Sequence, residues 1–174
     1  VELTREAAPT IDVKSRQQGD GIGYVRIASF GRRTAEQVRS QIASLTKGGA
    51  TRLIIDVRNS AGGDLAEGIA AARLFISSGT ISVRESRSNG QVKIAAEKGD
   101  GSITVPVSLL VDSGTSGPAE VFAAALAGNK RAELIGERTV GRTGVQEFVK
   151  LPDGSALWIT STRYLTPAGA QLQA

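Results

Sequence analysis

An apolar strand, a glycine-broken turn and a helix follow one another between Val107 and Leu126, and this succession is the feature that most constrains the fold. Residues Val107–Val111 predict a buried strand, and Asp112–Gly117 predict a turn. Pro118 favours a helix start, because a proline at the first helical position gives up an N–H that has no intrahelical partner. Such a succession presents backbone N–H groups and a small side chain at the edge of a sheet, as a nucleophile or an anion site requires.

The same alternation of strand and helix occurs twice more, upstream. A strand at Ile22–Ala28 precedes a helix that Thr34 is expected to cap, with Gln37 at the capping-box spacing. The nearly continuous apolar run Arg52–Val57 is typical of a strand covered on both faces, and a helix is expected after it from about Asp64 to Ser77. With a further strand at 132–136, these repeats predict an α/β fold with a central sheet covered by helices.

Two hairpins are expected outside this alternation. Ile81–Val83 and Val92–Ala95 flank a polar stretch and predict the first hairpin. Gly144–Leu151 and Ala156–Thr162 flank Pro152-Asp153-Gly154 and predict the second one.

Composition excludes several catalytic classes. The 174 residues, expected to form a single domain over 1–174, contain no cysteine and no histidine. Disulfides, thiolate zinc sites, Ser-His-Asp triads and imidazole-based catalytic zinc sites are therefore excluded. A hydrolytic mechanism would have to use Ser or Thr with an amine, a carboxylate or water, and no cofactor is implied.

Charge and hydropathy argue against two kinds of partner. The net charge is +4, but the basic residues are interspersed with acidic ones and no basic run interleaves with aromatics. We therefore expect a mildly basic, solvated surface and no nucleic-acid partner. No stretch approaches the roughly 20 apolar residues of a membrane span.

Several separated blocks resemble the carboxy-terminal processing (tail-specific) serine protease family. They lie between Gly21 and Gly169 and read GYVRIASF, DVRNSAGG, GTSGPAEVFAAAL, GERTVGRTGVQ and DGSALWITSTRYLTPAG. The resemblance implies the spiral fold also seen in crotonase-like proteins, and a protein or peptide partner engaged through its C-terminus. It also implies a cell-envelope location. Val1–Glu6 resembles the last strand of the PDZ module that precedes the family's core, so an upstream module is expected. The oligomeric state is not predicted.

The catalytic positions of the family carry other residues here. The resemblance places the family's serine nucleophile at Gly117, its lysine base at Arg142, and the glutamine that holds the lysine at Gln146. Glycine has no nucleophile, and an arginine with a pKa above about 12 cannot act as a neutral base near pH 7. The usual Ser/Lys dyad is therefore absent.

Each candidate residue has a functional and a structural interpretation. Ser116, one position before the expected nucleophile, is either a re-aimed nucleophile or a turn hydroxyl bonded to the amides around Ala119 and Glu120. The pair Gly62-Gly63 is either a tight turn or, as the resemblance implies, a source of oxyanion-hole N–H groups.

The arginine, glutamine and aspartate candidates also each have a functional and a structural interpretation. Arg142 is either a clamp for a carboxylate, such as a polypeptide C-terminus, or a surface arginine, and Gln146 either orients it or pairs in a strand. Asp56 and Asp112 each end an apolar strand and are either turn residues or a catalytic carboxylate pair.

Two functions remain open on the sequence. One is a working tail-specific serine peptidase that uses Ser116 or a water mechanism, with the Gly62-Gly63 amides as oxyanion donors. The other is a catalytically silent relative that binds C-terminal peptides or serves as a scaffold. The absence of both nucleophile and base favours the second function, because members of such a dyad act as a unit.

Overall fold

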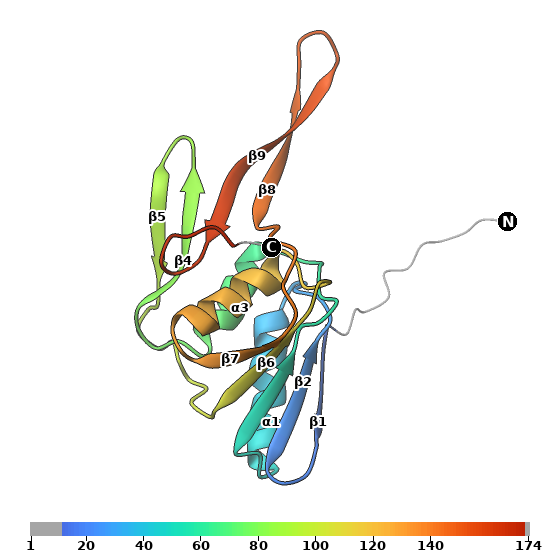
Figure 1. Cartoon of the computed structure of the whole chain (residues 1–174), viewed down its shortest axis with the longest axis vertical. Coiled ribbons are helices and arrows are strands. Elements are labelled where there is room, and N and C mark those ends of the chain that lie inside the picture. Colours follow the sequence, from blue (N-terminus) through green and yellow to red (C-terminus); the bar gives the residue numbers. More distant parts are fainter. Residues whose placement is uncertain (1–11, 173–174) are drawn as a thin grey trace, which may run out of the picture.

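The computed structural model describes residues 12–172 and contains two sheets and three helices in that range (Figure 1). In chain order the elements are β1 (Val13–Gln17), β2 (Ile22–Ile27), α1 (Thr34–Lys47), β3 (Arg52–Asp56), α2 (Leu65–Arg73), β4 (Thr80–Ser86), β5 (Gly90–Ala95), β6 (Val107–Val111), α3 (Pro118–Gly128), β7 (Ala132–Gly136), β8 (Gly144–Lys150) and β9 (Ala156–Leu165). The expected α/β class and the expected alternation of strands and helices are confirmed. The segment compared with a PDZ strand, Val1–Glu6, lies outside the described residues.

The larger sheet has the strand order β1-β2-β3-β6-β7. Strand β1 is antiparallel to β2, whereas β2, β3, β6 and β7 run parallel to one another. The carboxyl ends of the four parallel strands therefore meet at one edge of the sheet, where ligands bind in open α/β folds.

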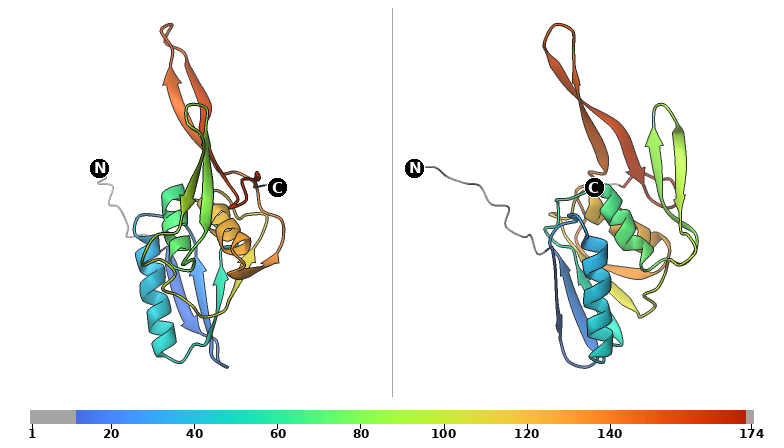
Figure 2. Two further views of the ribbon diagram at one scale, coloured as in Figure 1. Left: turned by 90° about the vertical axis from the view of Figure 1, so that its left-hand side faces the viewer. Right: turned by 180° about the vertical axis from the view of Figure 1, so that it is seen from behind.

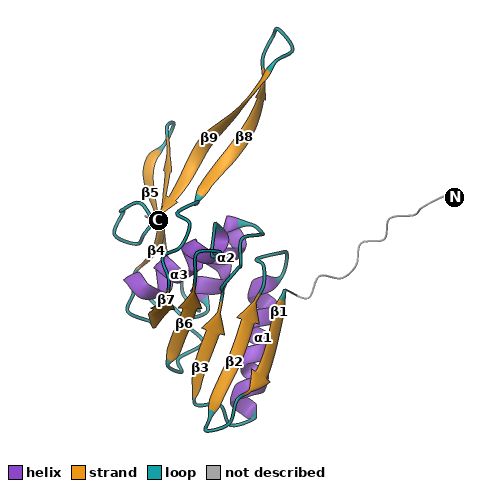
Figure 3. Ribbon diagram, turned by 45° about the vertical axis from the view of Figure 1, so that its right-hand side comes forward, coloured by secondary structure: helices purple, strands orange, loops and turns teal. Residues whose placement is uncertain are grey.

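Helix α1 lies behind β1 and β2 in Figure 3, α2 and α3 lie at the upper ends of the strands there, and the helices share one buried core with this sheet. Burial alternates along the central strands: Val25, Ile55 and Leu109 are fully buried in the core that the sheet shares with the helices, whereas Ile54 on the other face is only half-buried. The cover expected on both faces of β3 is therefore complete on the helix side and partial on the other side, where Asp56 is buried and Ile54 is half-buried. An apolar run of this kind occurs in strands whose second face is fully covered and in strands whose second face is partly covered, so the sequence could not distinguish the two.

The smaller sheet joins the two predicted hairpins. Its order is β5-β4-β9-β8, and β4 pairs with β9 antiparallel, with Val83 opposite Leu165. The β8–β9 hairpin projects away from the rest of the described chain (Figures 1 and 2). Phe148 and Trp158 stack on it edge to face at 5.4 Å, and both rings remain more than half exposed.

Two helix boundaries differ from the prediction. Arg33, not Thr34, is the residue before α1, and it adopts a left-handed conformation with φ 71°. Thr34 is the first helical residue, and its hydroxyl donates to the Gly31 carbonyl, so the predicted capping box does not form. Helix α2 ends at Arg73, before the predicted Ser77, and Asp64 caps its start by accepting from the Ala66 amide.

No helix within residues 12–172 has both the length and the apolar character needed to cross a bilayer.

Candidate active site

Three loops meet at the carboxyl edge of the larger sheet. We call them the glycine loop (58–63, after β3), the elbow turn (112–117, after β6) and the arginine loop (137–143, after β7). The Ser116 amide donates to the Ser60 carbonyl at 2.9 Å, which joins the elbow turn to the glycine loop. The Val140 amide donates to the Thr115 carbonyl at 3.1 Å, which joins the elbow turn to the arginine loop. The elbow turn is thus held between the other two loops.

Gly117, where the resemblance places the family's nucleophile, forms the bend of the elbow turn. Its φ is 61° and its ψ is −118°, a combination that residues with a side chain adopt at a cost. A Cβ at this position would nevertheless have room, since it would lie 3.6 Å from the Arg142 carbonyl oxygen and 3.9 Å from that of Ala61. The fold therefore keeps a place for a side chain between the two flanking loops, and the residue there has none.

Glu120 connects the elbow turn to the arginine loop, and sequence reasoning gave it no role. Its carboxylate is 1% exposed and accepts from the amides of Gly117 at 2.9 Å, Arg142 at 2.8 Å and Gly141. Three bonds to one carboxylate fix the start of α3 relative to the loop that carries Arg142. The available signal was Glu120 at the third helical position after Pro118, where a side chain reaches back to the residue before the helix.

The glycine loop supports both interpretations of its glycine pair. Gly63 has φ 118°, and a Cβ there would lie 2.2 Å from the Phe30 carbonyl oxygen, so only glycine fits. Gly62 has no such constraint: a Cβ there would meet only the Ser29 side chain, at 3.7 Å. Both residues are exposed, and within residues 12–172 neither amide has a hydrogen-bond acceptor.

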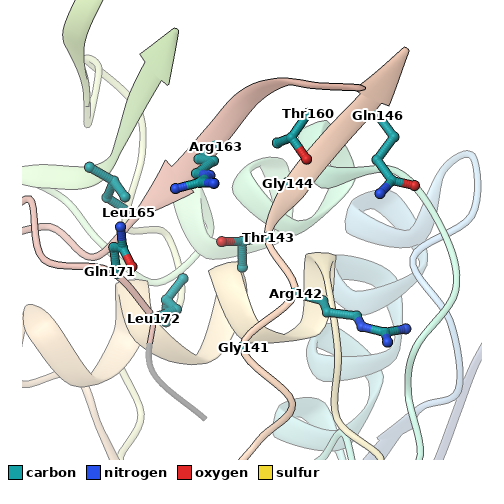
Figure 4. A pocket seen from close by; sticks show the side chains of 10 residues that line it. All are labelled: Gly141, Arg142, Thr143, Gly144, Gln146, Thr160, Arg163, Leu165, Gln171 and Leu172. Carbon is teal, nitrogen blue, oxygen red and sulfur yellow. The ribbon is translucent and has the colours of Figure 1, made fainter. Parts of the chain in front are cut away.

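Arg142 and Gln146, the positions matched to the family's lysine and glutamine, line one pocket. It has a volume of about 620 Å³, and the two side chains come to its wall from the arginine loop and the start of β8 (Figure 4). Both residues are exposed, whereas Thr143 between them is buried and its hydroxyl donates to the Tyr164 carbonyl. Arg142 is thus held through its backbone while its guanidinium is free to meet a ligand.

Ser116 is half-buried beside Gly117, and the capping predicted for it is not observed. The Glu120 amide donates to the Gly117 carbonyl at 3.0 Å, and the Gly117 amide is taken by the Glu120 carboxylate. The Gly117 carbonyl thus accepts from one of the amides that the sequence assigned to Ser116. The adjacent Thr115 is fully buried, and its hydroxyl donates to the Val57 carbonyl at 2.9 Å, so its role is structural.

Asp56 is engaged in an ion pair. The Arg58 guanidinium donates to both carboxylate oxygens, at 3.0 and 2.8 Å, and the Tyr24 hydroxyl donates at 2.6 Å. Burial alone would raise the pKa of Asp56, but the bonds from Arg58 and Tyr24 outweigh it and lower the pKa to about 2. Such a carboxylate stays ionised and cannot serve as a general acid.

Asp112 organises the elbow turn. Its carboxylate accepts from the amides of Asn59 and Gly114 and from the Thr115 hydroxyl, at 2.8–3.1 Å. Burial acts to raise the pKa of Asp112, and these bonds lower it below the usual value. Asp56 and Asp112 thus each have their own set of donors, as expected of turn residues.

Comparison with known proteins places this arrangement in a family. The model of peptidase family S41 matches residues 21–174. The chain is 33% identical over 170 residues to a carboxyl-terminal-processing protease of Picosynechococcus, covering 96% of this chain and 41% of the relative. It is 33% identical over 169 residues to the carboxy-terminal processing protease CtpA of Bacillus subtilis, covering 97% of this chain and 36% of that protein.

A solved structure agrees with these sequence matches. The photosystem II D1 C-terminal processing protease superposes with a TM-score of 0.83 at 31% identity, over 99% of this chain and 48% of that one. The chain thus spans less than half the length of these relatives. By sequence over most of its length and by fold, it belongs to peptidase family S41.

Proposed function

We propose that this chain is a catalytically silent, carboxy-terminal processing protease-like domain that binds polypeptide C-termini. The observation that carries the proposal is Gly117. Its backbone has the conformation of a nucleophile elbow and its surroundings leave room for a side chain, yet no hydroxyl or thiol is there. Because the family consists of peptidases, we take polypeptides as the ligands, and the residues of this site decide whether the polypeptide is cut or only bound.

Two independent chemical roles are missing. Gly117 removes the nucleophile, and Arg142 replaces a base with a permanent cation. Removing either member of such a dyad typically costs several orders of magnitude in rate, because the members act together. The frame around them is retained, since Glu120 still ties the elbow turn to the arginine loop through three amides. A cleft whose loops are held in place but which lacks nucleophile and base can bind a peptide without cutting it.

A working peptidase is the second candidate, and one observation favours it. Ser116 lies beside Gly117, and the exposed Gly62 and Gly63 amides have no acceptor among residues 12–172. Such amides are the donors that an oxyanion hole uses. In this alternative, Ser116 or a bound water attacks the peptide carbonyl.

The two candidates differ in one assay. The unaltered chain is incubated with an unstructured protein that has an apolar C-terminus, and cleavage is followed by mass spectrometry beside a Ser116→Ala variant and a matched Ser113→Ala control. We expect binding, measured by fluorescence anisotropy of the labelled protein, and no cleavage by any of the three. Cleavage that is lost only with Ser116→Ala would overturn the silent assignment and make Ser116 the nucleophile.

We also propose, from the family, that the whole protein carries an upstream PDZ-type module and works in the cell envelope. The relatives are longer than this chain, which covers 41% of the Picosynechococcus protease, so whole proteins of this family have room for a further module. Fractionation of cells that produce the whole protein, with detection of this domain, tests the second point.

A further inference from the structure

The pocket that Arg142 lines has an unusual charge balance. Its lining within the described chain combines two arginines, two glutamines and two threonines with glycines and leucines, and contains no acidic side chain: Gly141, Arg142, Thr143, Gly144, Gln146, Thr160, Arg163, Leu165, Gln171 and Leu172. Its volume of about 620 Å³ is within the range of small-ligand sites, roughly 300–1,000 Å³. A concave site with positive charge and hydrogen-bond donors attracts an anion.

The two arginines occupy different ends of the pocket. In Figure 4, Arg142 and Gln146 lie at one end, and Arg163 and Gln171 lie at the other. Neither arginine forms an ion pair within residues 12–172, in contrast to the arginines that pair with carboxylates elsewhere: Arg26, Arg33, Arg58 and Arg73. Glu85 is opposite Arg163 in the sheet, but its carboxylate accepts from the Gln91 amide instead. Both guanidinium groups therefore remain available.

We propose that the Arg142–Gln146 end of this pocket binds the terminal α-carboxylate of a polypeptide, a proposal that rests on the C-terminus-binding function above. A guanidinium presents parallel N–H donors that match both oxygens of a carboxylate, and the Gln146 amide is a further donor on the wall of the same pocket. Arg163, at the far end, adds positive charge that draws the chain end into the pocket.

The position of Arg142 explains why the ligand is a chain end. The Arg142 carbonyl lies 3.6 Å from where a side chain on Gly117 would begin, so this loop borders the place where a peptide bond is cut in an active relative. A cut at that place produces a new carboxylate there. A lysine that must lose its proton can act as a base, whereas an arginine stays charged and holds an anion. With arginine in place of lysine, this position thus loses its role as a base and can instead hold a C-terminal carboxylate like that of a cleaved product.

The loop is also stiff enough to act as an anchor. The Arg142 amide donates to the buried Glu120 carboxylate at 2.8 Å, and Thr143 is fixed to the Tyr164 carbonyl. The guanidinium therefore projects from a backbone that is held on both sides, which limits the entropy lost when a ligand binds.

The test compares one ten-residue peptide ending in three alanines, labelled with fluorescein at its N-terminus, in three forms. These are the free acid, the C-terminal amide, and an amide in which glutamate replaces the last alanine. Binding to the unaltered chain is measured by fluorescence anisotropy at low and high salt. The variants are Arg142→Gln and Arg163→Gln, and Arg138→Gln is the control because Arg138 lies in the same loop but lines a different pocket.

We expect the free acid to bind at least about tenfold more tightly than either amide, and Arg142→Gln to abolish that difference. Arg163→Gln should weaken the free acid mainly at low salt, and Arg138→Gln should leave all three peptides unchanged. Equal binding of acid and amide would overturn the carboxylate site while leaving the peptide-binding function in place. Preference for the glutamate amide would assign the pocket to an acidic side chain instead. Absence of binding by every peptide would overturn both proposals, and cleavage of any peptide would overturn the silent assignment alone.

Discussion

The conformation of Gly117 is the residue-scale feature that links fold and function in this chain. A φ of 61° with a ψ of −118° is easy for glycine and costs other residues on the order of 1–3 kcal/mol. In a nucleophile elbow such strain has a use, because it presents the nucleophile. Here the same backbone is adopted without strain, because Glu120 and the neighbouring loops hold the turn and glycine accepts it.

Gly117→Ala should lower the free energy of unfolding by about 1–3 kcal/mol, the cost of a side chain in this conformation, without a steric clash. Urea denaturation measures it. Gly62→Ala is the matched control, because its Cβ meets only the Ser29 side chain at 3.7 Å, and it should cost less. Equal losses in the two variants would mean that the Gly117 backbone is not strained for other residues.

Because of Asp56, the free energy of unfolding should decrease as the pH falls in the acid range. Its pKa in the folded chain is about 2, below the ordinary value of 3.8, so its contribution is present above about pH 4 and is lost as the pH falls through about 2. The contribution is about 1–2 kcal/mol after allowance for the half-exposed Arg58 partner. The slope of unfolding free energy between pH 5 and 2.5 should therefore decrease in Asp56→Asn and in Arg58→Gln. Unchanged slopes in both would contradict the assignment.

At the scale of elements, the structure shows which parts of the sequence were informative. The strands β2, β3 and β6 and the start of α3 were predictable, because apolar runs and Pro118 are local signals. The role of Glu120 was not, since its three amide donors include two from a loop more than 20 positions away. The pairing of β4 with β9 likewise joins segments about 80 residues apart, and each hairpin is locally complete without it. Burial and long-range partners are decided by packing, which single-sequence patterns do not contain.

Glu120→Gln should destabilise the chain by about 1–3 kcal/mol, because a glutamine side chain has one acceptor oxygen for the three N–H groups that two carboxylate oxygens now serve. Hydrogen exchange should accelerate at the Gly141 and Arg142 amides more than at the centre of α3. Glu137→Gln, an exposed change in the same loop, serves as the control. Unchanged exchange at Gly141 and Arg142 would show that Glu120 does not hold the loop.

The outer part of the β8–β9 hairpin should contribute little to the stability of the core. Trp158 is 68% exposed and stacks only on the exposed Phe148 at 5.4 Å. Trp158→Ala should therefore change the free energy of unfolding by less than about 1 kcal/mol, whereas Phe122→Ala in the core should cost about 3–5 kcal/mol. Chemical denaturation compares the two variants. A large loss from Trp158→Ala would mean that the hairpin packs against the body of the protein.

At the scale of the whole molecule, the chain has the fold of peptidase family S41, and in the silent domain proposed above two reactive groups of the cleft are replaced. The carboxyl ends of β3, β6 and β7 still bring the glycine loop, the elbow turn and the arginine loop together. Whether the cleft cuts a peptide then depends on which residues stand at two positions, Gly117 and Arg142, and not on the arrangement of its loops. We therefore infer that the frame of this cleft and its chemistry are separable.

The most direct test is to restore both groups. A Gly117→Ser, Arg142→Lys double variant is compared with the unaltered chain and with each single variant for cleavage of an unstructured protein with an apolar C-terminus. We predict cleavage by the double variant alone, at least about 100-fold above the background of the other three. An inactive double variant that is folded by circular dichroism, or cleavage by the unaltered chain, would contradict this prediction.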